Sequence, residues 1–204
     1  MKRNGFIRIE TLLALGITGV AGVLLLPALA QNSDTARDRE SKLGADCRSN
    51  LKQIHICIRQ YVQDYDEKYP IISSDQETFG WAKALEPYEE SRALFECPSE
   101  KHARNDDPRE AGYTDYWYNR NFAGINDSRD DWSAAQLLLL GDGDGGYQNS
   151  NARYAISALP KSWLTTKGSP AQRHFGGANY AFADGHVKWH SAARGGKDTT
   201  FITK

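Results

Sequence analysis

The sequence predicts an α+β fold, in which a long N-terminal helix packs on a small antiparallel β-sheet. Two observations predict the helix: residues 11–30 are twenty uncharged residues in a row, and apolar residues then recur at helical spacing over 43–65. A third observation predicts the sheet, because short apolar runs nearer the C-terminus are bounded by glycines and by an Asp-Gly turn signal at 184–185.

Length and charge limit what the chain can do. Its 204 residues leave room for one globular domain, 31–204, after the uncharged run. Basic and acidic residues are mixed along the chain, and the formal net charge is −1. The sequence contains no stripe of basic residues that could bind phosphate groups, so we expect no nucleic-acid partner.

The uncharged run is long enough to cross a bilayer as a helix, because twenty helical residues span roughly 30 Å. Lys2 and Arg3 precede it, so the positive-inside rule predicts a cytoplasmic N-terminus and an exported C-terminal domain. A secretory signal peptide is the competing interpretation. It would be cut before Gln31, after the small residues Ala28 and Ala30.

The segment GFIRIE at 5–10 resembles the N-terminal signature of type IV prepilins and type II secretion pseudopilins. In that family a leader ending in glycine is removed, the next residue is N-methylated, and a glutamate stands fifth in the mature chain. The resemblance implies a leader at 1–5, cleavage between Gly5 and Phe6, methylation of Phe6 and an assembly role for Glu10. A secretory signal peptide has no function for Glu10.

Glu10 has a physical use in such a subunit. Cleavage creates a positive amine on Phe6 at the membrane, and an unpaired charge in lipid costs on the order of 2.5–3.5 kcal/mol. The carboxylate of Glu10 on a neighbouring subunit can neutralise that amine. We therefore expect 6–30 to be both the transmembrane half and the polymerisation half of the helix.

The resemblance also implies partners, a location and a function. The partners are a prepilin peptidase, other pilin-like subunits of a homo- or hetero-oligomeric fibre, and the inner-membrane assembly machinery. The location is the bacterial inner membrane, as a single-pass protein with a periplasmic head, or a surface or periplasmic fibre. The implied function is structural, as a pilin-like subunit of a pilus or of a type II secretion pseudopilus.

One alternative is a membrane-tethered exported binding module that does not polymerise. Pro27 matches a proline common in the first helix of the family, but Arg8 stands where the family usually has an apolar residue. A charge there would hinder stacking of the helices, which favours the tethered module.

Beyond a polar neck at 31–42, the helical pattern predicts an amphipathic spine helix over 43–65, ended by Pro70. The segments 47–70 and 79–99 resemble a large bacterial family of prepilin-like proteins related to the major pseudopilin. We expect a short helix at 81–85 and strands within 113–119 and 134–142. The apolar stripe of the spine consists of Leu43, Cys47, Leu51, Ile54, Ile58, Tyr61 and Tyr65.

The segment 173–190 predicts a β-hairpin closed by a two-residue turn at Asp184-Gly185. Four large residues then share one face, which we expect to cover the spine at Leu51, Ile54 and Ile58. The predicted pairs are Ala183 with His186, Phe182 with Val187, and Tyr180 with Trp189.

The spacing of His174, nine residues and then Asp184-Gly185 resembles the C-terminal hallmark of that family. We expect His174 to be a cap or a buried hydrogen-bonding residue that fixes the hairpin. We expect no enzyme, because His186 and His190 lie about 13 Å apart along one strand and no nucleophile–base pattern is present elsewhere.

Asp142 and Asp144 alternate with glycines in GDGDGG, as in calcium loops, and related pseudopilins carry calcium in this region. Calcium at these two residues is therefore a candidate cofactor. An EF-hand loop starting at Asp142 fails, because its twelfth residue is Arg153 instead of glutamate. A glycine turn with solvated acids is the alternative.

Three cysteines cannot all pair. Cys47 and Cys57 lie about 15 Å apart on one helix, too far for a disulfide. In an oxidising compartment Cys97 can pair with either of them, and we favour Cys47 because it lies nearer the middle of the apolar stripe.

Overall fold

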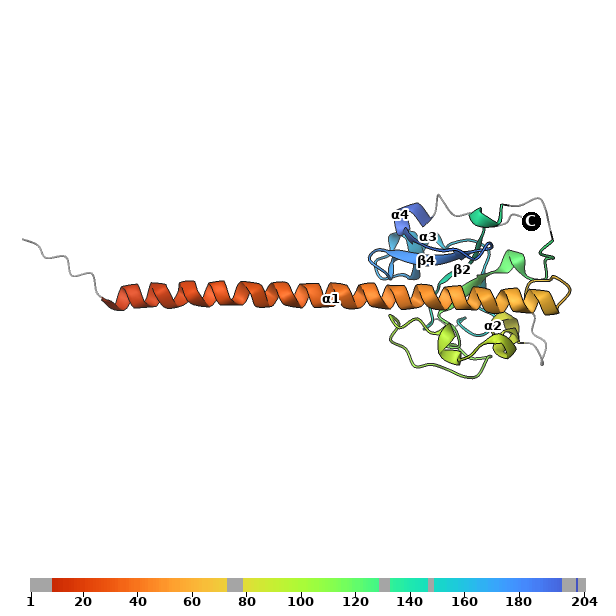
Figure 1. The fold of residues 1–204 in the computed structure, drawn as a ribbon, viewed down its shortest axis with the longest axis horizontal. Coiled ribbons are helices and arrows are strands. Elements are labelled where there is room, and N and C mark those ends of the chain that lie inside the picture. The colour runs from red at the N-terminus through yellow and green to blue at the C-terminus, as the bar shows by residue number, and fades with distance from the viewer. Residues whose placement is uncertain (1–8, 73–78, 129–132, 147–148, 196–200, 202–204) are drawn as a thin grey trace, which may run out of the picture. The chain divides into compact units, whose positions relative to one another are not determined.

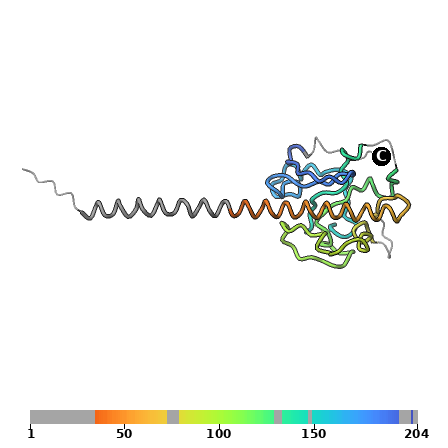
Figure 2. The backbone as a smooth tube through the Cα atoms, viewed as in Figure 1, coloured from red at the N-terminus to blue at the C-terminus, as the bar shows by residue number. Residues whose placement is uncertain are grey.

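The computed structural model describes the backbone of residues 9–72, 79–128, 133–146, 149–195 and 201 (Figures 1 and 2). In the N-terminal helix, side chains are described from residue 35 on. The chain divides into two compact units, Met1–Arg39 and Glu40–Lys204.

Helix α1 runs from Ile9 to Asp64. The expected leader 1–5 and the cleavage site between Gly5 and Phe6 lie outside the described residues, as do the side chains of 6–30, Glu10 among them. Among the residues whose side chains are described, no helix is both long and apolar enough to span a bilayer.

The last part of α1, from residue 40 to residue 64, is the spine of the larger unit. Its apolar stripe is buried as predicted from Cys47 to Tyr61, whereas Leu43 is only partly buried and Tyr65 is half exposed just beyond the helix. Residues 35–39 are exposed, as expected of the neck. The helix ends at Asp64 because Asp66 and Glu67 adopt positive φ angles of 52° and 59°, which a right-handed helix excludes. The fully buried members of the stripe are Cys47, Leu51, Ile54 and Ile58.

A five-stranded sheet packs on this spine (Figure 1). Its strands are in the order β3-β1-β2-β4-β5. The prediction of an antiparallel sheet is wrong at one edge, because β3 pairs in parallel with β1. The chain reaches this edge after β2, by a long connection instead of a hairpin, and so it can enter in the same direction as β1. The strands are β1 Tyr116–Asn119, β2 Leu138–Asp142, β3 Ala155–Ile156, β4 Gly177–Phe182 and β5 Val187–Ser191.

Short helices complete the larger unit. Helix α2 lies where the sequence predicts one, and it ends immediately before the 3-10 turn that holds Pro87. Side chains of α2 and of the following turns join the same core as the spine. The helices are α2 Gly80–Ala84, α3 Lys161–Thr165 and α4 Ala192–Gly195, and the 3-10 turns are η1 Glu86–Tyr88, η2 Arg92–Phe95, η3 Arg120–Phe122, η4 Ala134–Gln136 and η5 Pro170–Gln172.

The predicted register of the β4–β5 hairpin is wrong by one residue, because Ala181 pairs with Val187 and not Phe182. The N–H of Phe182 donates to the carbonyl of His186, which leaves a three-residue loop, 183–185. Gly185 has a φ of +87° and supplies the left-handed residue that such a loop requires. The glycine therefore specifies a bulged three-residue loop instead of the predicted two-residue turn.

The predicted face of β4 is also wrong. Tyr180 and Phe182 lie in a second cluster with Trp117 and Leu138, whereas the small Ala181 lies in the core around the spine. Aromatic side chains between strand and helix would hold the two backbones apart, and the backbone contacts described below require close approach. Small residues therefore occupy the spine face, and the aromatic residues pack on the other side of the sheet.

The contact between the hairpin loop and the spine yields a stability prediction. An added Cβ at Gly185 would lie 2.6 Å from the His55 ring, at a positive φ. We expect Gly185→Ala to lower the free energy of unfolding by about 2–4 kcal/mol, from left-handed strain and overpacking together. Urea unfolding followed by tryptophan fluorescence measures the change.

The matched control is Gly176→Ala. Its φ of +74° imposes similar strain, but no atom lies within 4 Å of the added Cβ. We expect this change to cost about 1–2 kcal/mol. Equal losses in the two variants would show that contact between the loop and the spine contributes nothing.

Candidate functional site

Four buried side chains from four separate segments meet beside the spine. We call Cys47, Cys97, Asp142 and His174 the His174 cluster; one potential ligand atom from each lies within 4.8 Å of all the others. Cys47 is on α1, Cys97 follows η2, Asp142 ends β2, and His174 lies between η5 and β4. All four were singled out from the sequence, but for three unrelated roles.

The structure joins Cys47 to Cys97 in a disulfide, the pairing that the sequence favoured, with 5.1 Å between the Cα atoms. Cys57 is a buried free thiol whose Sγ donates to the Tyr88 carbonyl. Burial and the neighbouring Glu89 raise the pKa of Cys57 to about 11. This thiol therefore stays protonated at neutral pH and is a poor nucleophile.

His174 is a buried hydrogen-bonding residue at the start of β4, as predicted. Its Nε2 atom lies 3.4 Å from Oδ2 of Asp142 and 3.7 Å from Sγ of Cys97. Its Nδ1 atom lies 3.4 Å from Oε1 of Glu40 on α1. The backbone N–H and carbonyl of His174 each form a hydrogen bond with Gly177, the first residue of β4. Because the side chain of His174 contacts α1, this residue joins the start of β4 to the spine.

Asp142 and Asp144 lie in different surroundings. Oδ2 of Asp142 accepts a hydrogen bond of 2.7 Å from the backbone N–H of Asn179, while Oδ1 is buried with no hydrogen-bond partner. Asp144 is half buried, and its backbone N–H donates to the Tyr154 hydroxyl. The structure does not bring the two carboxylates into one cluster, so it gives no support to a calcium site shared by Asp142 and Asp144.

Asp184 and Gly185 form a second anchor, at the other end of β4. The Gly185 carbonyl accepts from Lys52 Nζ at 2.6 Å, and the Ala183 carbonyl lies 3.2 Å from Nε2 of His55. Oδ1 of Asp184 accepts from the backbone N–H of His186 and so shapes the loop. His174 and Asp184-Gly185 therefore do not form one site; they hold the two ends of one strand on α1.

The middle of β4 is tied to the spine as well. Nδ2 of Asn179 donates to the Gly44 carbonyl at 3.2 Å, and Nε of Arg48 reaches Oδ1 of the same side chain. An added Cβ at Gly44 would lie 3.4 Å from the His174 ring, which is van der Waals contact distance, so the helix backbone at Gly44 lies close to this ring. Three successive contacts thus run along the strand.

Sequence reasoning missed a pair formed by His102 and Asp115, with Nε2 and Oδ1 2.5 Å apart. Burial raises the pKa of Asp115 despite the hydrogen bond it accepts from the Cys97 N–H. Partial burial opposes protonation of His102, but the Ala103 carbonyl and Asp115 raise the pKa of His102 overall. Because Nδ1 contacts Ala103 and Nε2 contacts Asp115, neither ring nitrogen faces a nucleophile.

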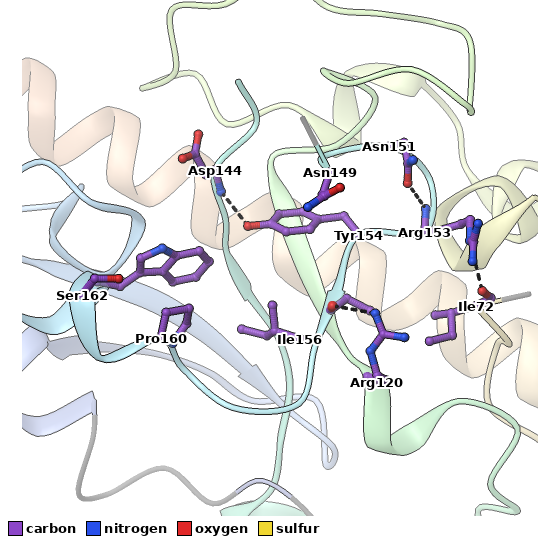
Figure 3. Close-up of a pocket in the computed structure, with 12 residues that line it drawn as sticks. Ile72, Arg120, Asp144, Asn149, Asn151, Arg153, Tyr154, Ile156, Pro160 and Ser162 are labelled. Carbon is purple, nitrogen blue, oxygen red and sulfur yellow. Dashed lines mark hydrogen bonds between the residues drawn. The ribbon is translucent and has the colours of Figure 1, made fainter. Parts of the chain in front are cut away.

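A groove of about 640 Å³ lies beside β3 and α3 (Figure 3). Tyr154, Ile156 and Trp163 supply its apolar wall. Arg120 donates to the Ala155 carbonyl, so part of its polar edge is already committed within the chain (Figure 3). The aromatic and polar lining is typical of a binding surface, and no histidine or cysteine is among its described lining residues.

A scan against protein-family models, a search of curated proteins and a search of solved structures find no match. The described polar groups mostly hold chain segments together. The disulfide joins the spine to the segment after η2, and the two anchors join the spine to β4.

The disulfide closes a loop between positions 50 residues apart. Replacing both Cys47 and Cys97 by alanine is expected to lower the free energy of unfolding by about 2–4 kcal/mol, because the unfolded chain regains the entropy of the open loop. Urea unfolding measures this change in the free energy of unfolding.

The control Cys57→Ala is expected to keep the faster mobility of the oxidised chain on a non-reducing gel. Equal mobility of the wild type with and without reductant would contradict the bridge.

The His55 contact predicts a pH dependence of stability. Burial, helped by the Lys52 and Arg59 charges, lowers the pKa of His55 below its ordinary 6.5, although the Ala183 carbonyl acts in the opposite direction. The unfolded chain therefore binds more protons between the folded pKa and about 6.5, and stability falls as the pH falls through that window.

His55→Gln isolates this contribution, because glutamine does not titrate and keeps a donor for the Ala183 carbonyl. Between pH 7.5 and pH 5.5 the wild type is expected to lose more stability than the variant. Urea unfolding at both pH values gives the two losses. If they are equal, His55 is not linked to folding as described.

Proposed function

We propose that this chain is a structural prepilin-like subunit. It is processed by a prepilin peptidase between Gly5 and Phe6 and assembles through its N-terminal helix into a pilus or a type II secretion pseudopilus. The observation that carries the proposal is the segment GFIRIE, whose glutamate stands directly before the uncharged run 11–30. A carboxylate in this place is costly in lipid unless it meets a positive group, and the amine created by cleavage is such a group.

The fold supports this proposal. An α+β head built on the last part of a long N-terminal helix leaves the first part of the same helix for another task. In a pilin-like subunit that task is insertion into the membrane and then packing in a fibre. The pilin-like fold itself is part of the proposal.

The contacts along β4 also suit a fibre subunit. The strand is held on α1 near its start by Glu40 and His174, in its middle by Gly44 and Asn179, and at its end by Lys52. The disulfide fixes another segment to the same helix. These contacts keep β4, the segment after η2 and the last part of α1 together as one unit, as a fibre subunit requires of its head.

The groove of Figure 3 favours a second candidate function, a tethered exported module that binds a ligand and does not polymerise. Tyr154 and Trp163 offer it an aromatic surface, and Asn149, Asn151 and Asp144 offer it polar groups. Under this alternative the N-terminal helix serves only as an anchor.

Glu10→Ala separates the two functions. We expect the variant to be inserted in the membrane as efficiently as the wild type, but to enter sheared fibres roughly tenfold less or worse, because the buried amine of its neighbour stays unpaired. The measurement compares the membrane fraction with the sheared fibre fraction of cells that express the peptidase and the other subunits.

The control is Asp34→Ala, which removes an acid of the neck beyond the uncharged run and is expected to change neither fraction. If Glu10→Ala enters fibres as well as this control, the assembly role fails. If the wild type forms no fibre while its groove binds a ligand, the tethered module is the better account.

A further inference from the structure

We propose that the His174 cluster binds one zinc ion, or a similar soft divalent cation, when the bond between Cys47 and Cys97 is reduced. Two cysteines, one histidine and one aspartate are a ligand set that zinc accepts. All four side chains are buried, and their potential ligand atoms lie within 4.8 Å of one another. The disulfide and the metal exclude each other, because both need the same two sulfur atoms.

Two contacts of His174 already have the spacing of a tetrahedral site. Zinc bonds of about 2.0–2.3 Å place neighbouring ligand atoms roughly 3.3–3.8 Å apart. Nε2 of His174 lies 3.4 Å from Oδ2 of Asp142 and 3.7 Å from Sγ of Cys97. The two sulfur atoms have to separate, and the ligand atoms of all four residues already lie within 4.8 Å of one another.

An unpaired oxygen is the second observation that indicates a ligand. Asp142 is only 1% exposed, and its Oδ1 atom has no hydrogen-bond partner among the described residues. Leaving a carboxylate oxygen buried in this state is costly, and a carboxylate that binds the ion through both oxygens satisfies Oδ1 together with Oδ2, the oxygen that already lies 3.4 Å from Nε2 of His174. The disulfide form does not satisfy it.

Neighbouring groups already orient two side chains of the cluster, as the residues behind the ligands of a metal site do. Oε1 of Glu40 lies 3.4 Å from Nδ1 of His174, which orients the ring and leaves Nε2 for the metal. The N–H of Asn179 holds Oδ2 of Asp142 at 2.7 Å and so fixes the carboxylate. Both ligands that are not cysteines are therefore positioned before any ion arrives.

A dithiol is the reductant that opens the disulfide between Cys47 and Cys97. The dithiol transfers two electrons and two protons to the S–S bond, which breaks to give two thiols, and the dithiol itself becomes a disulfide. Zinc then displaces both thiol protons to solvent and binds the two thiolates. An external disulfide that accepts two electrons from the two thiolates, and is itself reduced to thiols, would release the ion and reform the bond.

A cobalt titration tests the site directly. The full chain in detergent micelles is reduced under anaerobic conditions, desalted and titrated with Co²⁺ alone and then with Zn²⁺. One equivalent of Co²⁺ is expected to give thiolate-to-metal absorption and the strong visible bands of a tetrahedral site, and one equivalent of Zn²⁺ is expected to remove them. The oxidised chain is expected to give neither.

Matched variants assign the ligands that are not cysteines. Asp142→Asn and His174→Gln are expected to weaken zinc binding by more than tenfold, and Glu40→Gln by about tenfold. The controls Asp144→Asn and Cys57→Ala are expected to bind as the wild type does.

Circular dichroism of each reduced sample checks its fold. If a ligand variant is unfolded, the cobalt titration of the wild type alone decides whether the reduced cluster binds metal. A reduced wild type that has lost its fold, a cobalt spectrum without thiolate absorption, or equal zinc binding by folded Asp142→Asn and Asp144→Asn would each overturn the proposal.

Discussion

The close approach of β4 to the last part of α1 is the constraint on which the rest of the head depends. Hydrogen bonds from Asn179 to Gly44 and from Lys52 to Gly185 join strand and helix directly. Such contacts leave no room for large side chains between the two backbones, which explains why Ala181 of β4 faces the spine whereas Tyr180 and Phe182 face away. The same approach brings His174 beside Cys47, so the buried cluster and the contacts of the hairpin loop follow from the packing of one strand on one helix.

Local patterns predicted the elements well and their pairing poorly. Helical spacing of apolar residues identified the spine, and Pro70 with the residues before it identified where the spine ends. Both signals are local, because each is carried by residues that lie close together in the sequence. The register of the hairpin was missed by one residue, since Asp184-Gly185 fits both a two-residue and a three-residue loop. The parallel strand β3 has two residues, too few for any periodicity to show.

The candidate site was predictable residue by residue but not as an assembly. Cys47, Cys97, Asp142 and His174 each stand in a recognisable motif, and the pairing of the two cysteines was favoured from the helix stripe alone. Their meeting depends on four segments far apart in the chain, and no local spacing records it. The calcium interpretation gained no support, because Asp142 is the buried last residue of β2 whereas Asp144 follows in a loop, so GDGDGG is not one continuous loop.

The central claim is that the N-terminal segment is a prepilin signal and not a secretory one. The most direct test is the intact mass and N-terminal sequence of the protein extracted from the membrane fraction of cells that contain an active prepilin peptidase. We predict a chain that begins at N-methylated Phe6 and keeps Glu10. A chain that begins at Gln31 would contradict the claim, because the whole assembly segment would then be absent from the mature protein.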